Sequence, residues 1–193
     1  MMLVLGTMAQ EARAANPNGE LEALIDGIAA GSREDLAELY RRTRAAVYGL
    51  ALSYLKNGAE AEDVAQDTFV KVWAAAPSYR PQGKPMAWLL TIARNLALGR
   101  LRTAARIQDL SEAQWSAFSI ESDTLTADDR TVLAAALGRL SDEERHIVVL
   151  HAVCGLKHRE IAQFLGLALP TVLSKYHRSL KKLKTILEGD DAQ

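Results

Sequence analysis

Basic and hydroxyl side chains recur in residues 170–187 at spacings that place them on one side of a helix. At about 100° per residue they fall within an arc of about 120°. A helix fits the major groove of DNA, where Arg, Lys, Ser and Thr contact base edges and phosphates. The predicted chemistry is therefore recognition of a polyanion rather than bond making. The residues of this face are Thr171, Ser174, Lys175, Arg178, Lys181 and Lys182.

The charges of the chain are segregated along the sequence. The 193 residues hold 23 Lys+Arg and 24 Asp+Glu, a formal net charge of −1. Residues 80–108 contain 6 basic residues and no acidic one, and residues 157–184 contain 7 basic residues and one acidic residue, Glu160. Such blocks are often solvated helix faces, but they also fit two polyanion-binding surfaces. The position of the charges on helices decides between these interpretations.

The C-terminal block has the pattern of a helix-turn-helix. A short helix over 159–165 is followed by a turn at 166–169, and Pro170 stands where a helix accepts proline. This combination favours DNA binding over an ordinary amphipathic surface helix. We expect base contacts from Lys175 and Arg178 and phosphate contacts from Lys181, Lys182 and Lys184. Arg159, Leu173 and His177 complete the predicted DNA-binding set, while the packing face comprises Val172, Tyr176, Leu180, Leu183 and Leu187.

The elements that must position these residues are all predicted to be helices. Apolar residues recur at helical spacing, no segment alternates as a strand does, and Asn57-Gly58 and Pro77–Pro85 interrupt the pattern. Val64, Phe69, Val72 and Trp73 are expected to face the core. Helix caps are expected at Ser32, with Asp35, at Thr126, with Asp129, and at Ser141, with Glu144. The predicted helices cover residues 21–30, 32–56, 60–75, 86–106, 159–165 and 170–187, with two more after Thr126 and Ser141.

The expected fold class is all-α, with two small helical domains joined by a linker, the C-terminal one a helix-turn-helix. The predicted boundaries are a flexible extension at 1–19, a first domain at 20–106, a linker at 107–126, a second domain at 127–187 and a tail at 188–193.

Three separated motifs carry a family resemblance. The segment GLKHREIAQFLGLALPTVLSKYHRSLKKLK (155–184) resembles the promoter −35 binding domain, region 4, of bacterial extracytoplasmic-function (ECF) sigma factors, in the sigma-70 family. The core-polymerase-binding helix of that family resembles AEAEDVAQDTFVKVW (59–73), and its −10-element helix resembles WLLTIARNLALGRLR (88–102). Together with flanking helices the resemblance covers residues 20–187, in the family's order, so that 20–106 matches region 2.

The resemblance implies a role for each half. Glu62, Asp63, Gln66 and Asp67 would dock on the clamp of the largest polymerase subunit, although such acids also suit a solvated helix face. The loop from Ser78 to Lys84 would capture a flipped base of the non-template strand. Trp88 and Tyr79 would offer planar faces to bases, and Trp88 fits the core equally well. The implied −10 set is Tyr79, Arg80, Lys84, Trp88, Thr91, Arg94, Asn95, Leu98 and Arg102.

The chain departs from the family pattern at several positions. Gly99 replaces the usual Asp, and a mid-helix Gly costs about 1 kcal/mol relative to Ala. Ala168 and Pro170 stand where the family often has Pro and Gly. Leu173 replaces a basic or polar residue, and it can touch a thymine methyl but donates no hydrogen bond. The −35 sequence therefore cannot be carried over from relatives.

We expect no catalytic site, cofactor, metal or small-molecule substrate. Cys154 is the single cysteine, so no internal disulfide is possible, and with His146, His151, His158 and His177 it lacks the spacing of a structural zinc site. We expect Cys154 to be buried and the histidines to be structural or on the surface. No apolar run reaches the length of a membrane span, so we expect a cytoplasmic protein, associated with the nucleoid when bound to polymerase.

Three hypotheses remain open at this stage. The first is an alternative sigma factor that binds core RNA polymerase, through its clamp and flap, recognises −35 and −10 promoter elements and promotes promoter melting. The resemblance also implies an anti-sigma factor as a partner. The second is a stand-alone helix-turn-helix regulator, and the third is a sigma mimic that acts as an anti-sigma decoy. The acidic helix at 60–73 and the acid-free block at 80–108 favour the first hypothesis over the second. The intact basic face at 171–182 favours it over the third.

Overall fold

A computed structural model describes residues 17–107 and 135–188 of the chain. Within these ranges the protein is helical and contains no strand, which confirms the predicted all-α class. The elements, in chain order, are α2 (Pro17–Ala29), α3 (Arg33–Leu55), α4 (Gly58–Ala75), the 3-10 helix η1 (Ala76–Ser78), α5 (Pro85–Ile107), α7 (Asp142–Ala152), α8 (His158–Leu165) and α9 (Leu169–Glu188).

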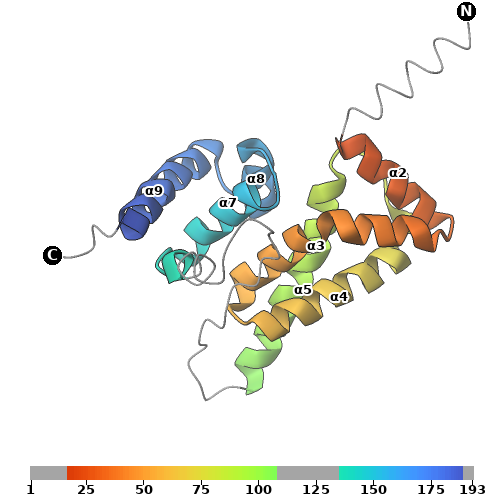
Figure 1. Cartoon of the computed structure of the whole chain (residues 1–193), viewed down its shortest axis with the longest axis horizontal. Helices are drawn as coiled ribbons and strands as arrows, with labels where there is room; N and C mark the ends of the chain where they lie inside the picture. Colours follow the sequence, from red (N-terminus) through yellow and green to blue (C-terminus); the bar gives the residue numbers. More distant parts are fainter. Residues whose placement is uncertain (1–16, 108–134, 189–193) are drawn as a thin grey trace, which may run out of the picture.

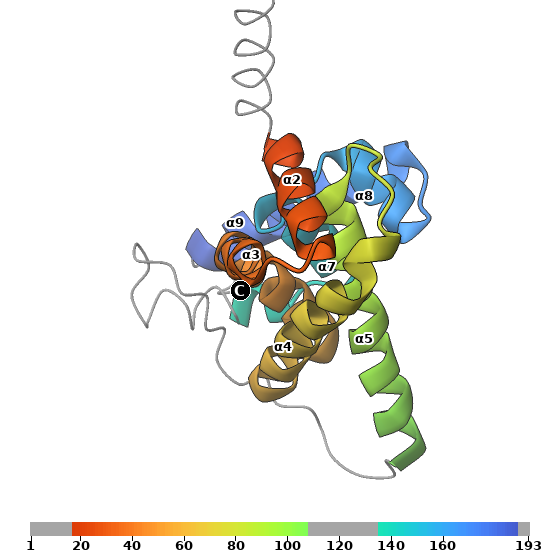
Figure 2. The same ribbon diagram turned by 90° about the vertical axis from the view of Figure 1, so that its right-hand side faces the viewer.

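The long helix α3 is the centre of the N-terminal half. It contacts α2, α4 and α5, and its C-terminal part is buried almost without interruption from Ala46 to Leu55. The helices α4 and α5 pack on α3 and on each other (Figure 1). The C-terminal end of α5 runs beyond the other helices in both views (Figures 1 and 2), and residues 101–105 are exposed. Much of α5 is therefore an accessible surface.

Local capping explains where α3 and α4 begin and end. The Ser32 side chain accepts a hydrogen bond from the Asp35 backbone N–H at 3.1 Å, as predicted for an N-cap. Lys56 ends α3 in the left-handed conformation, with a φ of 57°. The helix α3 ends before Asn57, as expected, and the Asn57 side chain also caps α4 by accepting a hydrogen bond from the Glu60 N–H. For this reason α4 begins two residues earlier than the sequence pattern predicts.

The C-terminal half contains the predicted helix-turn-helix. Ser141 and Glu144 form a reciprocal capping box at the start of α7, as expected. Gly166 ends α8 with a φ of 71°, a conformation that glycine adopts without steric cost. Pro170 is the second residue of α9, where the missing N–H has no helical partner to lose. These features orient α9 against α7 and α8.

The two halves are packed against each other through α3 and α7. The ring of His146 stacks on Tyr54, with centroids 3.8 Å apart and an interplanar angle of 18°. The Cys154 thiol is buried and donates to the Ala46 carbonyl at 3.5 Å, and Lys56 pairs with Asp142 at 2.9 Å. A single hydrophobic core therefore continues across both halves.

Three core predictions are wrong, and α2 differs from the expected boundary. Trp73, Leu180 and Leu187 are 37%, 42% and 49% exposed, because no described neighbour covers these sides of α4 and α9. Val172 and Leu183 are buried, as predicted. The helix α2 begins at Pro17, within the segment predicted as an extension. The predicted Thr126–Asp129 cap and the predicted linker beyond Ile107 lie outside the described residues.

Replacing Gly99 by Ala should stabilise the protein by about 1 kcal/mol, because Gly99 lies inside α5 and a Cβ there would meet nothing within 4 Å. The gain should appear as a higher urea midpoint with an unchanged m-value. Gly49→Ala is the matched control, since its Cβ would lie 3.1 Å from Val153 Cγ1 in the contact between α3 and α7. Its gain should be smaller or negative. Equal gains at both positions would contradict this assignment of the two glycines.

Candidate nucleic-acid and polymerase interfaces

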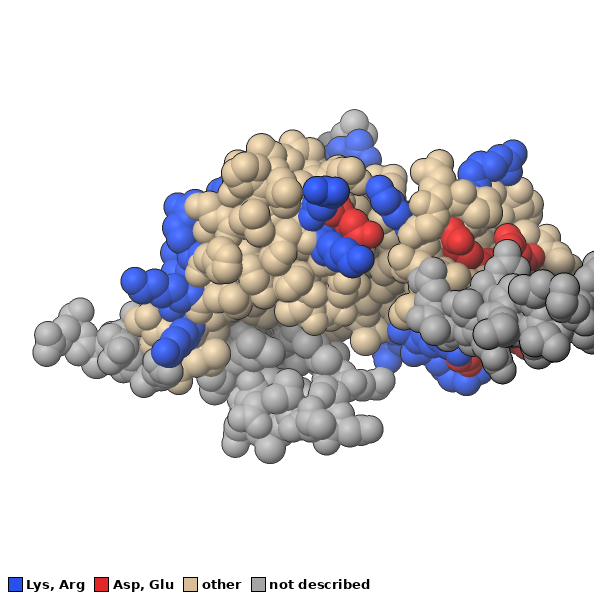
Figure 3. Space-filling view, turned by 90° about the horizontal axis from the view of Figure 1, so that it is seen from above, with Lys and Arg blue, Asp and Glu red and all other residues tan. Residues whose placement is uncertain are grey.

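The predicted −35 residues lie along one exposed side of α9 and at the start of α8. Thr171 and Lys175 are half-buried, whereas Arg159 is exposed on α8. In Figure 3, Lys and Arg side chains follow one another along the end of the molecule that α9 forms. A free, basic helix face of this kind suits major-groove docking. The exposed members on α9 are Leu173, Ser174, His177, Arg178, Lys181 and Lys182.

Two of these cations also hold α9 on α7. Lys175 pairs with Glu143 at 2.7 Å, and Lys182 pairs with Glu144 at 2.7 Å. Glu144 is only 6% exposed and also belongs to the capping box of α7. The hydrogen bond from Lys182, followed by those from Ser141, lowers the pKa of Glu144 below its ordinary value. Lys182 therefore has a structural contact that its sequence position did not reveal.

A shallow hollow of about 410 Å³ collects positive charge beside this face. Cationic side chains around one concavity attract anions such as phosphate oxygens. Arg139, which precedes α7, joins the three cationic side chains that α9 contributes to this hollow. The sequence pattern did not single out Arg139. The lining residues are Arg139, Arg178, Lys181, Lys182, Thr185 and Ile186.

The predicted −10 residues of α5 form an accessible stripe. Thr91, Asn95 and Arg102 are exposed and Leu98 is half-buried, at spacings of three or four residues. The Thr91 hydroxyl donates to the Ala87 carbonyl at 2.7 Å, a local bond that a DNA acceptor can replace. The loop residues Arg80 to Lys84, which precede α5, are all exposed.

Tyr79 does not present the open planar face that the sequence suggested. It is only 9% exposed, its ring packs against Trp88 with centroids 4.9 Å apart, and its hydroxyl donates to Glu22 Oε1 at 3.0 Å. Burial, and then the hydrogen bond to Glu22, raises the pKa of Tyr79 to about 12. Trp88 is half-buried, so it contacts the core side of the loop and keeps part of its surface accessible.

The loop and α5 border a hollow of about 440 Å³, and α8 closes its other side. Lys84 Nζ donates to Gln163 Oε1 at 2.9 Å. Arg94 donates to the Phe164 carbonyl at 3.3 Å, and its guanidinium lies 5.4 Å from the Phe164 ring centroid. Two predicted −10 residues are therefore engaged by the helix-turn-helix half.

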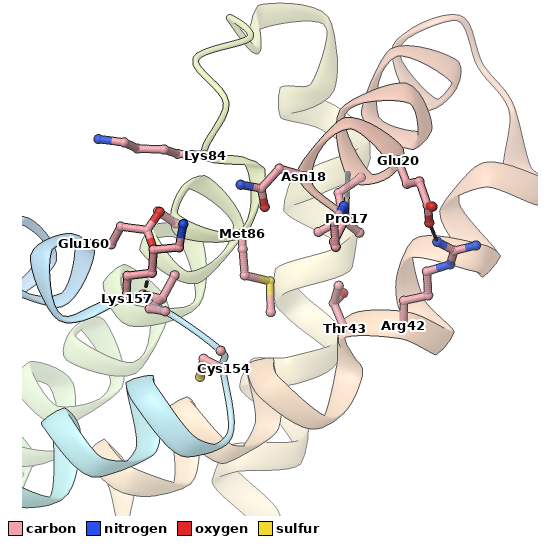
Figure 4. A pocket seen from close by; sticks show the side chains of 14 residues that line it. Pro17, Asn18, Glu20, Arg42, Thr43, Lys84, Met86, Cys154, Lys157 and Glu160 are labelled. Carbon is pink, nitrogen blue, oxygen red and sulfur yellow. Dashed lines mark hydrogen bonds and ion pairs between the residues drawn. The ribbon is translucent and has the colours of Figure 1, made fainter. Parts of the chain in front are cut away.

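A second cavity between the halves, of about 490 Å³, lies next to these contacts (Figure 4). Asn18 of α2 and Lys84 of the loop line it from the N-terminal half. Lys157 and Glu160 line it from α8, and Cys154 from the segment after α7. The cavity marks a less tightly packed part of the contact between the halves than the α3–α7 core.

The predicted polymerase-binding residues lie on α4. Asp63, Gln66 and Asp67 are exposed, whereas Glu62 is half-buried and pairs with Arg44 at 3.0 Å. Arg100 of α5 pairs with Asp67 at 3.0 Å, with Glu60 at 3.1 Å and with Asp63 at 3.5 Å. Asp67, followed by Glu60, raises the pKa of its guanidinium. The carboxylates therefore have an intramolecular cation but remain open to a partner.

Two apolar side chains on the same side of α4 were missed by sequence reasoning. Val70 is 70% exposed and Trp73 is 37% exposed, next to Gln66 and Asp67. A large aromatic side chain beside acids is typical of the anchor positions of protein interfaces. Val70 follows Gln66 by four residues and Trp73 by seven, a spacing that places the three on one side of a helix.

The four histidines and Cys154 form no metal site in the part of the chain that the structure describes. His151 and His158 stack with centroids 4.3 Å apart, and Tyr176 packs edge-on against both rings. Burial raises the pKa of the Cys154 thiol to about 12, which agrees with the expectation of a buried residue. Within the same described ranges, no helix combines the length and apolar character that crossing a membrane requires.

His146 should make the contact between the halves sensitive to acid. Burial lowers its pKa from 6.5 to about 4 in the folded protein. The unfolded chain binds this proton at higher pH, so stability is fully present above pH 6.5 and falls as the pH drops towards 4. After a discount for partial exposure, we expect a loss of about 1–2 kcal/mol from this residue.

His146→Phe, which keeps a ring on Tyr54, should flatten that loss by the same amount. The measurement is the free energy of unfolding in urea at pH 7 and pH 4.5, for both proteins. Since carboxylates also titrate in this range, the difference between the two proteins is the relevant quantity. Parallel pH profiles would show that His146 is not the group responsible.

Comparison with known proteins identifies the family. Residues 39–107 match the family model for Sigma-70 region 2, and residues 130–183 match that for Sigma-70 region 4. An ECF RNA polymerase sigma factor SigK from Mycobacterium sp. (strain KMS) is 31% identical over 176 residues, covering 87% of this chain and 91% of the relative. The Mycobacterium ulcerans SigK is 30% identical over 178 residues, covering 88% and 95%.

Two solved structures have a similar fold. CnrH in complex with the cytosolic domain of CnrY has a TM-score of 0.62 and 28% identity, covering 89% of this chain and 99% of that one. The sigma factor RpoE in complex with the anti-sigma factor NepR, from Bartonella quintana, has a TM-score of 0.67 and 26% identity, covering 80% and 98%. With regions 2 and 4 in order and exposed basic helices in both halves, the chain belongs to the sigma-70 family and is an ECF sigma factor, a transcription initiation factor.

Proposed function

We propose that this sigma factor binds core RNA polymerase through the exposed side of α4 and promoter DNA through α5 and α9. The observation that carries the proposal is the separation of charge on the fold. The acids of α4 lie beside exposed Val70 and Trp73, whereas the predicted DNA-facing sides of α5 and α9 are basic or polar. A negatively charged template is attracted to the latter surfaces and repelled by the former.

The C-terminal half reads the −35 element in this proposal. Leu173 and Ser174 are exposed near the start of α9, where a recognition helix reaches base edges, and Arg178 is exposed on the next turn. Lys181 lies one turn further along and lines the cationic hollow with Arg139, so it suits a phosphate contact. Lys175 and Lys182 combine this role with their ion pairs to α7.

The N-terminal half opens the −10 element. Thr91, Asn95, Leu98 and Arg102 follow one strand along α5, and the hollow beside Trp88 receives an extruded base. Lys84 and Arg94 each donate a hydrogen bond to α8 in the structure, so both are free for DNA only after the two halves separate and these bonds break. In the free chain the two halves therefore pack against each other. Binding to polymerase selects a conformation in which the halves are separated.

An anti-sigma factor is a further proposed partner, since the similar sigma factor RpoE was solved in complex with the anti-sigma factor NepR. A binder that favours the packed arrangement would keep Lys84 and Arg94 bonded to α8. The flap of core polymerase is the proposed partner of the C-terminal half. We place the protein in the cytoplasm, where its polymerase and promoter are found.

Transcription with purified core polymerase tests the proposal. Templates carrying randomised −35 and −10 elements are transcribed with and without this protein, and the transcripts are sequenced. The proposal predicts transcripts that share one promoter pattern and require the protein. Duplex DNA binding without core would support a stand-alone regulator. Binding to an anti-sigma factor with neither activity would support a decoy.

Val70→Asp should weaken binding to core polymerase at least about tenfold, because it places a charge in the apolar part of the α4 surface. Fluorescence anisotropy of labelled protein titrated with core measures the affinity. Arg41→Ala, an equally exposed change on α3, is the control and should leave the affinity unchanged. Stability should be unaltered in both, since Val70 is 70% exposed. An unchanged affinity for Val70→Asp would exclude this side of α4.

Arg178→Ala and Lys181→Ala should affect promoter recognition differently. Loss of a base contact relaxes the preference at one −35 position, whereas loss of a phosphate contact weakens all sequences alike and lowers the salt slope by about 1. Holoenzyme binding to a set of −35 variants at several salt concentrations measures both effects. Equal losses on every sequence for both variants would contradict the assignment of Arg178 as a base contact.

A further inference from the structure

The loop between η1 and α5 is held in shape by side chains of α2. Glu22 Oε1 accepts two hydrogen bonds, from the Tyr79 hydroxyl at 3.0 Å and from the Gly83 backbone N–H at 2.9 Å. The Gly83 carbonyl accepts from Asn18 Nδ2 at 2.9 Å. Both ends of the exposed segment Arg80–Lys84 are therefore tied to one helix that lies about sixty residues earlier in the chain.

The bonds to Gly83 select one of the many backbone conformations that glycine can adopt. Gly83 has a φ of 68°, which side-chain-bearing residues rarely adopt, and no atom within 4 Å would restrain an added Cβ. Tyr79 packs on Trp88 at one end of the loop, whereas a Cβ at Gly83 would meet no atom within 4 Å, so this end depends more on hydrogen bonds. The Gly83 N–H donates to Glu22 and the Gly83 carbonyl accepts from Asn18, so both polar groups of this backbone unit are hydrogen-bonded. An exposed loop without such ties samples many conformations and loses entropy when it binds a ligand.

The anchored loop forms the wall of the hollow next to Trp88. Tyr79 supports Trp88 through its ring, and Ser78, Arg80, Gln82 and Lys84 line the cavity of about 440 Å³. The same Glu22 oxygen thus fixes the residue under the aromatic wall and the glycine at the far end of the loop. A shift of either bond changes the shape of the cavity that an extruded base would enter.

We propose that Glu22 is a positioning residue for promoter opening, which holds the Tyr79–Gly83 loop in the shape that receives an unpaired base of the −10 element. The inference rests on the proposed role of this half in DNA melting. Glu22 itself does not contact DNA. Its carboxylate acts by accepting two hydrogen bonds, so its charge is dispensable and its oxygen is not.

Substitutions at Glu22 distinguish a requirement for its charge from a requirement for its acceptor oxygen. Glu22→Gln keeps an oxygen acceptor and should open promoters as the native protein does. Glu22→Ala removes both hydrogen bonds and should slow opening about tenfold. Tyr79→Phe removes one of the two bonds and should give an intermediate loss. Glu20→Ala is the control, because Glu20 pairs with Arg42 on α3 and does not touch the loop.

The experiment uses holoenzyme with purified core and a promoter selected by the native protein. A 2-aminopurine in the non-template strand of the −10 element reports base extrusion, while anisotropy measures core affinity and thermal unfolding measures stability. Glu22→Ala should lose extrusion with unchanged core affinity and a nearly unchanged Tm. Native extrusion by Glu22→Ala would overturn the inference, as would a loss in Glu22→Gln equal to that in Glu22→Ala.

Three further outcomes are distinguishable. A parallel fall of Tm, core affinity and extrusion in Glu22→Ala would assign Glu22 to general stability and overturn the positioning role. If the native holoenzyme selects a promoter and transcribes it but produces no extrusion signal at any −10 position, the proposed melting role of this half fails together with the inference. If the native protein supports no transcription, the proposed function itself fails.

Discussion

The packing of α7 against α3 is the contact on which the described arrangement depends. Tyr54 and His146 stack there, Cys154 is buried there, and Lys56 joins Asp142 at the margin. Asp142 also pairs with Arg145, whose buried guanidinium donates to the carbonyls of Leu137 and Leu140. The interface thus connects the start of the helix-turn-helix half to the centre of the other half, and it brings α8 against Lys84 and Arg94.

Ion pairs within each half balance the cations of the two basic surfaces in a sigma factor whose net charge is −1. Cations on α9 pair with Glu143 and Glu144, and Arg100 pairs with the acids of α4. The pairs of Lys175 and Arg100 are partly exposed and contribute little stability individually, so a binding partner can compete for them at small cost. The pair of Lys182 differs, because its partner Glu144 is buried. Charge is balanced within the chain, but it is distributed for two different partners.

The sequence pattern was sufficient to predict most of the helices of the fold. Helix caps at Ser32 and Ser141, the turn at Gly166 and the helical periodicity predicted the elements because these signals act over a few residues. The exposure of Trp73 and Leu180 was not predictable in this way. Periodicity identifies an apolar stripe, whereas its burial depends on whether another helix lies opposite.

The candidate site was predictable in its residue types and less so in its contacts. The stripe of α5 and the basic side of α9 followed from spacing within one helix. The ties from Glu22 to Tyr79 and from Asn18 to Gly83 join residues 57 and 65 positions apart, and no local rule connects them. The burial of Tyr79 and the contacts of Lys84 and Arg94 with α8 likewise arise only from tertiary packing.

The distance between the two halves, measured in the free protein and in the promoter-bound holoenzyme, tests the account most directly. Cysteines introduced at exposed Ala45 and Ala152, which lie beside the contact of Cys154 with Ala46, carry the fluorophores, and the native Cys154 is buried and should not react. Single-molecule energy transfer should report one short distance for the free chain and a longer one for the transcribing complex. A short distance retained in an actively transcribing holoenzyme would contradict the account, because Lys84 and Arg94 would still be bonded to α8.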